Sequence, residues 1–295
     1  MSPEVTAVVT THGRPHRVQQ ALASLRAETH RDVDLVVVDD GDEFDSSAGV
    51  DDVRLRVVRG FGLGVAGARN LGLDAARGEF VIFLDDDDVA LPHRISSLVA
   101  AARRHRASLC FGMTRRQVEG TSEVLDCVPT HVLPPGAVGF CDLLTCNPHV
   151  NAVLVRTEAL RAVGGFDAGA DHFDDWSAWL RIADRNAVMW RIADVVAEWR
   201  IHPRGLSANI LEKRAMKARL LSLFERLQTC LSEENARAVA IARRLIAPAD
   251  VRTYDDYAAI MAAAREQLHS EAACFGPHPC HRATGSRISV ARQHV

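Results

Sequence analysis

Apolar and polar positions follow a repeating pattern over the first 115 residues of the chain. Short continuous apolar runs predict buried strands at 5–9, 35–38, 55–58, 80–84 and 109–113. Between these runs, apolar positions recur at helical spacing and predict intervening helices over 15–28, over 65–77 and from Pro92 onward. Strands that are apolar throughout and alternate with helices are typical of a parallel sheet covered on both faces. The pattern therefore predicts a doubly wound α/β half.

The pattern changes in the middle of the chain. Residues 114–156 contain short apolar stretches separated by glycine and proline, which indicates extended strands and long loops. A helix is predicted over 157–163, where Gly164-Gly165 ends it, and another begins near Asp174. Two short strands are expected around 187–200.

The following segment, 209–269, is rich in Ala, Leu and Arg and is predicted to be helical with an interruption at Pro248. Its apolar stripe consists of Leu220, Phe224, Leu227 and Leu231. This stripe predicts packing against the preceding domain or against a second copy in a homodimer. Contact with an anionic membrane surface is the alternative, because basic residues lie just before the stripe. The last 25 or so residues are predicted to be disordered.

Composition excludes several classes of protein. The net charge is −3, 47% of residues are hydrophobic and 25% are charged, which fits a soluble globular protein without a nucleic-acid partner. Seven scattered cysteines indicate reduced thiols and a cytoplasmic location. A zinc site is one hypothesis for a C-terminal cluster, although its spacing matches no standard zinc module and a flexible tail is the alternative. The cluster comprises His269, Cys274, His278, Cys280 and His281.

The run Gly62-Leu63-Gly64-Val65-Ala66-Gly67 matches the dinucleotide-binding pattern Gly-x-Gly-x-x-Gly, and Asp85 follows at about the spacing of the ribose-binding acid. Two features argue against a dinucleotide cofactor. A complete strand–helix–strand unit precedes the glycines, whereas the fingerprint belongs after the first strand. Four consecutive aspartates would also place unneeded charge beside the adenosine. The glycines are better interpreted as the rim of another diphosphate-binding site.

The aspartate run Asp85–Asp88 is the most informative single feature. It follows a predicted buried strand, and ligands bind beyond the carboxyl ends of parallel strands. Clustered carboxylates repel one another, and oxygen ligands suit Mg²⁺ or Mn²⁺. If the segment stays extended, Asp85 and Asp87 point to one side and Asp86 and Asp88 to the other. The alternative is an acidic turn that caps the next helix.

A second acidic pair, Asp174 and Asp175, falls at the predicted start of a helix. One role for such residues is helix N-capping. The other is general-base catalysis, in which a carboxylate takes a proton from an incoming nucleophile. The residues alone leave both roles open.

The motifs "AVVTTHGRP", "LVVVDDGD", "GLGVAGARNLGLDAARGEFVIFLDDDD", "VGGFD…DDWSAWLRIA" and "WRIHPRGLS" occur in an order that resembles family-2 glycosyltransferases. The resemblance covers about residues 4–208. It implies the α/β GT-A fold, a Rossmann-like and mostly parallel sheet flanked by helices, with a C-terminal helical extension. The implied organisation is a catalytic domain over 1–208, divided into a nucleotide-binding half (1–115) and an acceptor-binding half (116–208). A helical extension over 209–270 and a disordered tail over 271–295 follow.

The resemblance also implies roles for individual residues. The nucleotide-binding candidates are Thr10, Thr11, Arg14, Asp39, Asp40, Gly64, Arg69, Asn70, Asp85 and Asp86. The metal ligands are expected to be Asp87, Asp85 and His202, and the cation Mn²⁺ or Mg²⁺. Asp175 is assigned as the catalytic base, with Asp174 beside it. The acidic pair is usually Glu-Asp in the family, so the shorter Asp174 leaves open which of the two carboxylates is the base.

The implied activity is inverting transfer of a sugar from a UDP-, dTDP- or GDP-sugar to an acceptor hydroxyl by metal-assisted single displacement. Saccharides, lipid-linked sugars and secondary metabolites are the candidate acceptors. His12-Gly13 and Gly41-Asp42 depart from the usual family motifs and leave the base preference undecided. A sugar nucleotidyltransferase and a non-catalytic nucleotide-sugar-binding protein are the alternative functions.

Overall fold

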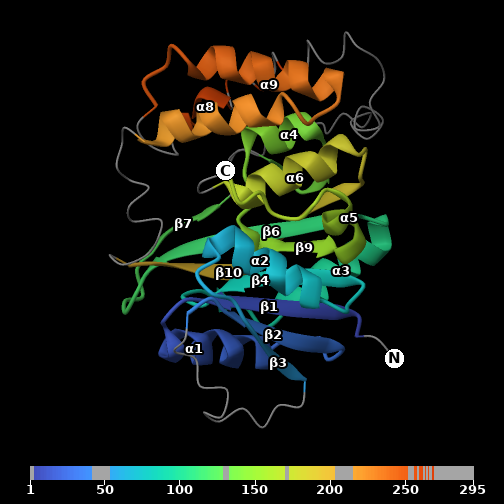
Figure 1. Ribbon diagram of the computed structural model, residues 1–295, viewed down its shortest axis with the longest axis vertical. Coiled ribbons are helices and arrows are strands. Elements are labelled where there is room, and N and C mark those ends of the chain that lie inside the picture. The colour runs from blue at the N-terminus through green and yellow to red at the C-terminus, as the bar shows by residue number, and fades with distance from the viewer. Residues whose placement is uncertain are drawn as a thin grey trace, which may run out of the picture.

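The computed structural model describes most of the chain and shows one mixed sheet between layers of helices (Figure 1). The described residues are 3–41, 54–128, 133–169, 173–202, 215–251 and several positions between 256 and 268. The C-terminal Cys/His cluster and the predicted disordered tail lie outside them.

The first half of the sheet is parallel, as the sequence pattern predicts. Its strands are β1 (Val5–Thr11), β2 (Val33–Asp39), β3 (Leu55–Arg59) and β4 (Phe80–Asp85), in the order β3-β2-β1-β4. The flanking helices are α1 (Pro15–Arg26), α2 (Gly64–Ala75) and α3 (Arg94–His105). Because all four strands run the same way, their carboxyl ends lie at one edge of the sheet.

Side chains alternate between two cores along these strands. Ala7 and Val9 pack with the apolar faces of α1 and α3 on one side of the sheet. Val8 packs with α2 on the other side. Gly72 of α2 lies directly on β1, since a Cβ atom there would lie 2.3 Å from the Cγ1 atom of Val8. Both faces of the strands are therefore buried, which explains their unbroken apolar sequence.

The second half of the sheet is mixed, so the prediction of a mostly parallel sheet holds only for the first half. β9 (Val153–Arg156) lies antiparallel between β4 and β6 (Leu109–Val118). The short strands are β5 (Val89–Ala90), β7 (Val124–Val128) and β8 (Gly136–Val138), all antiparallel to their partners.

The expectation of two short strands around 187–200 is wrong. A single strand, β10 (Met189–Ile201), spans this region and runs parallel to β6. Its register shifts between Arg191 and Ala197. The irregularity includes the exposed pair Ala193-Asp194, and such exposed positions interrupt the buried apolar pattern as a turn would.

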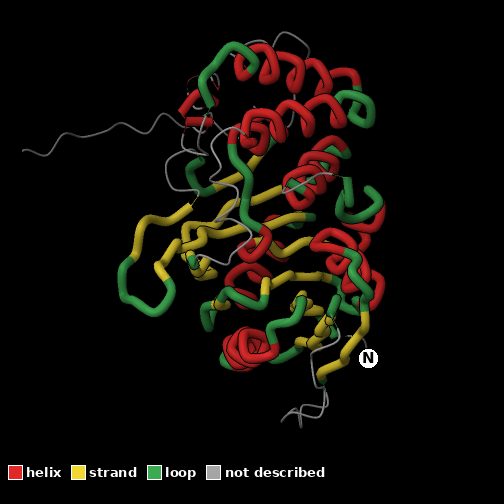
Figure 2. Tube along the Cα trace, turned by 60° about the vertical axis from the view of Figure 1, so that its left-hand side comes forward, coloured by secondary structure: helices red, strands yellow, loops and turns green. Residues whose placement is uncertain are grey.

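The remaining helices lie on the α2 side of the sheet. They are α4 (Phe140–Thr145), the 3₁₀ helix η1 (Val150–Ala152), α5 (Thr157–Ala162), α6 (Asp174–Asp184), α8 (Ala215–Leu227) and α9 (Glu233–Ile246). Figure 1 and Figure 2 show α8 and α9 side by side beyond α4 and α6. Trp176 of α6 contacts the rings of Phe224 and Tyr257, so the C-terminal helices share one core with the preceding domain.

The apolar stripe of α8 faces this core: Leu220, Phe224 and Leu227 are buried. Packing within the chain therefore accounts for these positions. In the described part of the chain, no helix combines the length and apolar character that crossing a membrane requires.

Candidate active site

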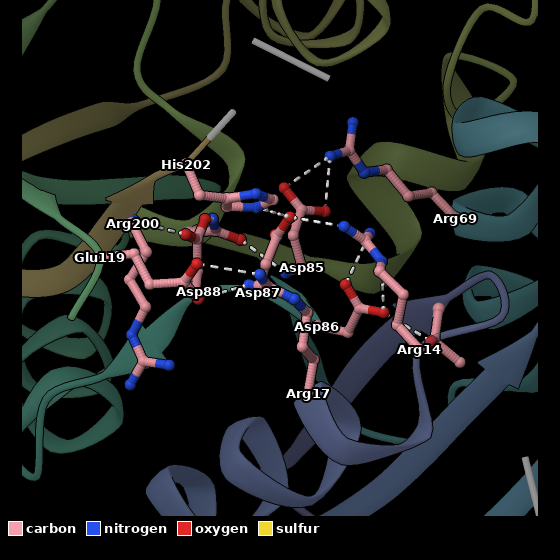
Figure 3. Close-up of polar contacts among 12 residues, drawn as sticks. Arg14, Arg17, Arg69, Asp85, Asp86, Asp87, Asp88, Glu119, Arg200 and His202 are labelled. Carbon is pink, nitrogen blue, oxygen red and sulfur yellow. Dashed lines mark hydrogen bonds and ion pairs between the residues drawn. The ribbon is translucent and has the colours of Figure 1, made fainter. Parts of the chain in front are cut away.

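The candidate site lies at the carboxyl edge of the parallel strands, where β1 and β4 end side by side (Figure 3). Thr10 pairs in register with Asp85 across these strands. The Oγ1 atom of Thr11 donates to Asp86 Oδ2 at 2.5 Å. Arg14 donates to Asp86 Oδ2 at 3.1 Å and to Asp87 Oδ2 at 2.7 Å. The loop after the first strand is therefore tied to the aspartate run.

The aspartate run forms a tight turn rather than an extended segment. The backbone N–H of Asp88 donates to the carbonyl oxygen of Asp85 at 3.1 Å. The condition for the expected alternation, an extended segment, is therefore not met, and the turn brings its first and last residues together. Asp86 and Asp88 are buried, at 1% and 2% exposure, while Asp85 and Asp87 are half-buried.

Asn151 holds this turn in place. Its Oδ1 atom accepts a hydrogen bond from the backbone N–H of Asp85 at 2.9 Å, and its Nδ2 atom donates to Asp88. The backbone N–H of Arg200 donates to the other oxygen of Asp88 at 2.8 Å. Burial, together with the neighbouring Asp87 and Asp85, raises the pKa of Asp88 well above its usual value.

Two groups of metal-ligating side chains surround the turn. His202, directly after β10, places Nε2 3.0 Å from Asp87 Oδ2, which brings together two of the three ligands expected from the sequence. Asp85, Asp88 and His149 bring one ligand atom each to within 4.8 Å of one another. Burial lowers the pKa of His149 to about 4, so the ring is neutral at pH 7 and can bind a cation. The donor set of carboxylate oxygens and imidazole nitrogen fits a divalent cation.

Arg69 joins the two acidic sites that the sequence places far apart. It is 6% exposed, and it donates to Asp85 Oδ1 at 2.9 Å and to Asp174 Oδ2 at 2.8 Å. Burial alone would raise the pKa of Asp85, but Arg69, together with the nearby His149 and Arg14, outweighs burial and holds that pKa below its usual value. The nucleotide-binding half and the start of α6 therefore meet at a single guanidinium group.

Asp175 is the member of the acidic pair that Arg69 does not contact directly. It is 6% exposed, and its Oδ1 atom accepts from the backbone N–H of Trp176 at 2.7 Å and from Asn147 Nδ2 at 3.3 Å. Burial and the neighbouring Asp174 raise the pKa of Asp175 to about 7. A carboxylate with this pKa can take up a proton near neutral pH.

Other predicted nucleotide-binding residues make contacts within the protein. Asp39 is fully buried and forms an ion pair with Arg59. Asp40 accepts hydrogen bonds from the backbone N–H groups of Leu63 at 2.7 Å and of Gly64 at 2.8 Å. Gly62 and Gly64 both have positive φ angles, of 73° and 72°, with open space around the Cα atom. These glycines allow the backbone conformation of the loop, and the carboxylate of Asp40 fixes the loop through its two hydrogen bonds.

Asn70 also has a contact that the sequence does not indicate. Its Nδ2 atom donates to the carbonyl oxygen of Phe166 at 2.8 Å, and its Oδ1 atom accepts from the backbone N–H of Phe166 at 2.7 Å. It thereby fastens the Gly164-Gly165 loop to α2. The nucleotide-binding roles of Asp39, Asp40, Gly64 and Asn70 remain predictions.

Sequence reasoning missed three residues of this site: Asn147, His149 and Asn151. All three lie in the stretch "CNPHVNAVLV", directly before the apolar strand β9. Polar side chains at the border of a buried strand are a usable signal. However, β9 runs antiparallel to β4, so these residues precede their strand, whereas the aspartates of the Asp85–Asp88 turn lie at the end of β4 and after it.

Comparisons with known proteins show what the chain is similar to. Residues 6–126 match glycosyl transferase family 2. A Campylobacter jejuni protein named GalNAc(5)-diNAcBac-PP-undecaprenol beta-1,3-glucosyltransferase is 33% identical over 125 residues, which cover 40% of each chain. The UDP-Glc:alpha-D-GlcNAc-diphosphoundecaprenol beta-1,3-glucosyltransferase WfgD of Escherichia coli is 22% identical over 70% of this chain and 80% of its own.

Solved structures support the same fold. TarS of S. aureus matches with a TM-score of 0.62 and 17% identity, over 85% of this chain and 44% of its own. The mannosyltransferase PcManGT from Pyrobaculum calidifontis, in complex with GDP-Man and Mn²⁺, matches with a TM-score of 0.59 and 17% identity. The match covers 96% of this chain and 83% of the mannosyltransferase chain. Residues 6–126 therefore resemble glycosyltransferase family 2, and the fold is the GT-A fold. The chain spans well under two-thirds of several of the curated relatives that it matches.

Proposed function

We propose that this protein is an inverting glycosyltransferase that moves a sugar from a nucleoside-diphosphate sugar to an acceptor hydroxyl. The observation that carries the proposal is the bridge from Arg69 to Asp85 and Asp174. Through Arg69, Asp85 and the Asp174-Asp175 pair belong to one cluster. A displacement requires the donor and the acceptor to meet at one site, and this cluster supports such an arrangement. The family-2 match and the names of the relatives support the same reaction class.

The donor side of the proposed site combines the Gly62–Gly64 loop with the loop after β1. Arg14 lies against Asp86 and Asp87, with its side chain 37% exposed, so its guanidinium can contact a ligand phosphate as well. The site would hold Mn²⁺ or Mg²⁺ through carboxylates of the turn, with Asp85, Asp87 and His202 as the ligands inferred from the sequence. When bound, the cation would offset the negative charge that develops on the leaving nucleoside diphosphate.

Asp175 is proposed as the general base. Its two hydrogen bonds fall on Oδ1, which leaves Oδ2 for the acceptor hydroxyl. Because Arg69 holds Asp174, the proton is assigned to Asp175, whose pKa lies near 7. The acceptor oxygen attacks the anomeric carbon from the face opposite the diphosphate while the bond to the diphosphate oxygen breaks. The hydroxyl proton passes to Asp175, and the anomeric configuration inverts.

The substrates are proposed by chemical class. UDP-, dTDP- or GDP-sugars are the candidate donors, and structures of GT-A relatives include complexes with UDP-GlcNAc and GDP-Man. A saccharide on a polyprenyl diphosphate is the leading acceptor, because two relatives are named for transfer to such lipids. A free saccharide and a secondary metabolite are the other candidates. The seven scattered cysteines of the sequence support the proposal of a reducing, cytoplasmic environment.

The experiment is an assay of nucleoside-diphosphate release and of glycosylated product over a panel of nucleotide sugars with Mn²⁺ or Mg²⁺. Asp175→Asn should keep donor binding and lose transfer. Asp87→Ala should lose metal-dependent release. Asp74→Asn, at an exposed position of α2, is the matched control and should behave as wild type.

Three results would contradict parts of the proposal. Full transfer by Asp175→Asn would exclude it as the base. Full wild-type activity without a divalent cation would remove the role of Asp87. Release of pyrophosphate from a nucleoside triphosphate and a sugar phosphate would point instead to a nucleotidyltransferase.

A further inference from the structure

The segment from His149 to Ala152 lies against the aspartate turn because of the sheet topology. β9 follows this segment and runs antiparallel to β4, with Leu154 opposite Ile82. The start of β9 is therefore beside the end of β4, where Asp85 begins the turn. His149 stands at the N-cap position of η1, directly before it, and Asn151 lies within η1. One short segment thus supplies two polar side chains to the turn.

The two histidines near the turn have different surroundings. Nε2 of His202 lies at hydrogen-bonding distance, 3.0 Å, from Asp87, and the same carboxylate oxygen also accepts from Arg14. The Nδ1 atom of His149 is buried and has no hydrogen-bond partner among the described residues. A buried imidazole nitrogen without a partner is costly, and a cation is one group that would satisfy it.

Among the described residues, the carboxylates beside His149 share a single ion pair, between Asp85 and Arg69. Asp85 and Asp88 each bring an oxygen into the group of ligand atoms that lie within 4.8 Å of one another. Arg69 pairs with Asp85, but it also pairs with Asp174. No ion pair joins Asp88 to a basic side chain in the described part of the chain; its partners are Asn151 and the backbone of Arg200. A divalent cation between the two carboxylates would relieve their repulsion.

We propose that His149 is a nitrogen ligand of the divalent cation, together with Asp85 and Asp88, and that it makes the site select Mn²⁺ over Mg²⁺. Mg²⁺ prefers a shell of oxygen ligands with retained waters, whereas an imidazole nitrogen favours transition metals. The proposal makes His149 the nitrogen ligand in place of His202, which the sequence-inferred set contains and which lies against Asp87 instead. It rests on the proposed function only in that the reaction uses a divalent cation.

Neighbouring groups orient the proposed ligands. The ring of His149 stacks on Trp199, with centroids 4.7 Å apart and planes inclined by 20°, which fixes the ring plane. Asn151 binds the backbone of Asp85 and the carboxylate of Asp88, so it holds both oxygen ligands at once. Such outer contacts are what a metal site needs to keep its ligands in position.

The test is Mn²⁺ binding, followed by electron paramagnetic resonance, with pulsed detection of ¹⁴N coupling to the bound ion. The full chain is titrated with Mn²⁺ alone and again with UDP present. Wild type should show ¹⁴N coupling. His149→Asn should lose that coupling, bind Mn²⁺ at least ~10-fold more weakly, and discriminate less between Mn²⁺ and Mg²⁺. His93→Asn, at an exposed histidine, is the control and should retain wild-type binding.

His202→Asn separates the two histidines and does not depend on the folding of the His149 variant. Retained ¹⁴N coupling in His202→Asn supports His149 as the ligand. Loss of coupling in His202→Asn, persistence of coupling in a folded His149→Asn, or absence of Mn²⁺ binding to wild type would each overturn the proposal. A wild type that binds Mn²⁺ with ¹⁴N coupling but transfers no sugar would contradict the proposed function alone.

Discussion

Arg69 is the residue whose replacement tests the site most directly. Arg69→Met keeps a long apolar side chain and removes the guanidinium that joins Asp85 to Asp174. The side chain of Arg69 is 7% exposed, that of Asp174 is 8% exposed and that of Asp85 is 25% exposed. The substitution therefore leaves at least one buried carboxylate without its cation.

The expected loss of stability follows from the burial of these carboxylates. Removing one partner of a buried ion pair lowers the free energy of unfolding by about 3–5 kcal/mol. Asp174 belongs in that range, and the better solvated Asp85 adds less. Arg69 also lowers the pKa of Asp175, so its loss moves that pKa further above about 7. Without Arg69, the negative charges of Asp85, Asp174 and Asp175 repel one another, and protonation removes that repulsion. The loss of stability should therefore be largest at pH 8 and should shrink towards pH 5.

The assay is urea denaturation followed by the fluorescence of Trp176 and Trp179, at pH 8 and at pH 5. Arg77→Met, at an exposed position just after α2, is the control and should change stability little. Adding Asp174→Asn to Arg69→Met should restore part of the lost stability, with a coupling of about 1–3 kcal/mol. An equal loss at both pH values, together with no effect of Asp174→Asn, would refute the reasoning.

Three further predictions concern packing and protonation. Gly72→Ala should lower the free energy of unfolding by about 1–3 kcal/mol in urea denaturation, because the new Cβ atom would lie 2.3 Å from the Cγ1 atom of Val8. Adding Val8→Ala to this variant should relieve the loss. Burial raises the pKa of Glu28 to about 7 from 4.5. The stabilising contribution of Glu28 to the free energy of unfolding is therefore fully present below pH 4.5, and up to about 3 kcal/mol of it is lost as the pH rises through 7. Glu28→Gln should abolish that dependence, and unchanged stability–pH curves would contradict it. For Asp175, kcat/KM should fall about tenfold per pH unit below an apparent pKa of about 7, whereas a flat profile down to pH 5 would exclude it as the base.

Much of the fold was predictable because each element has a local signature. The apolar runs of β1, β2 and β4 and the helical spacing of α1 to α3 predicted the parallel half, and the structure confirms it. The second half was less predictable. β10 contains a register shift with exposed residues, and a local pattern cannot distinguish such an irregularity from a turn. The antiparallel insertion of β9 between β4 and β6 also has no local signature, because strand order depends on distant contacts.

By itself, the sequence determined that carboxylates follow β4 and stand at the start of α6, and that a glycine-rich loop leads into α2. These features are local, since they depend on residue type and on position along one element. Only the tertiary structure decided that Arg69 joins Asp85 to Asp174, that Asp40 holds the glycine loop, and that His149 lies beside Asp85 and Asp88. The partners in these contacts come from different elements. Their distances are set by strand order and by the turn at Asp85–Asp88, which no periodicity along the chain encodes.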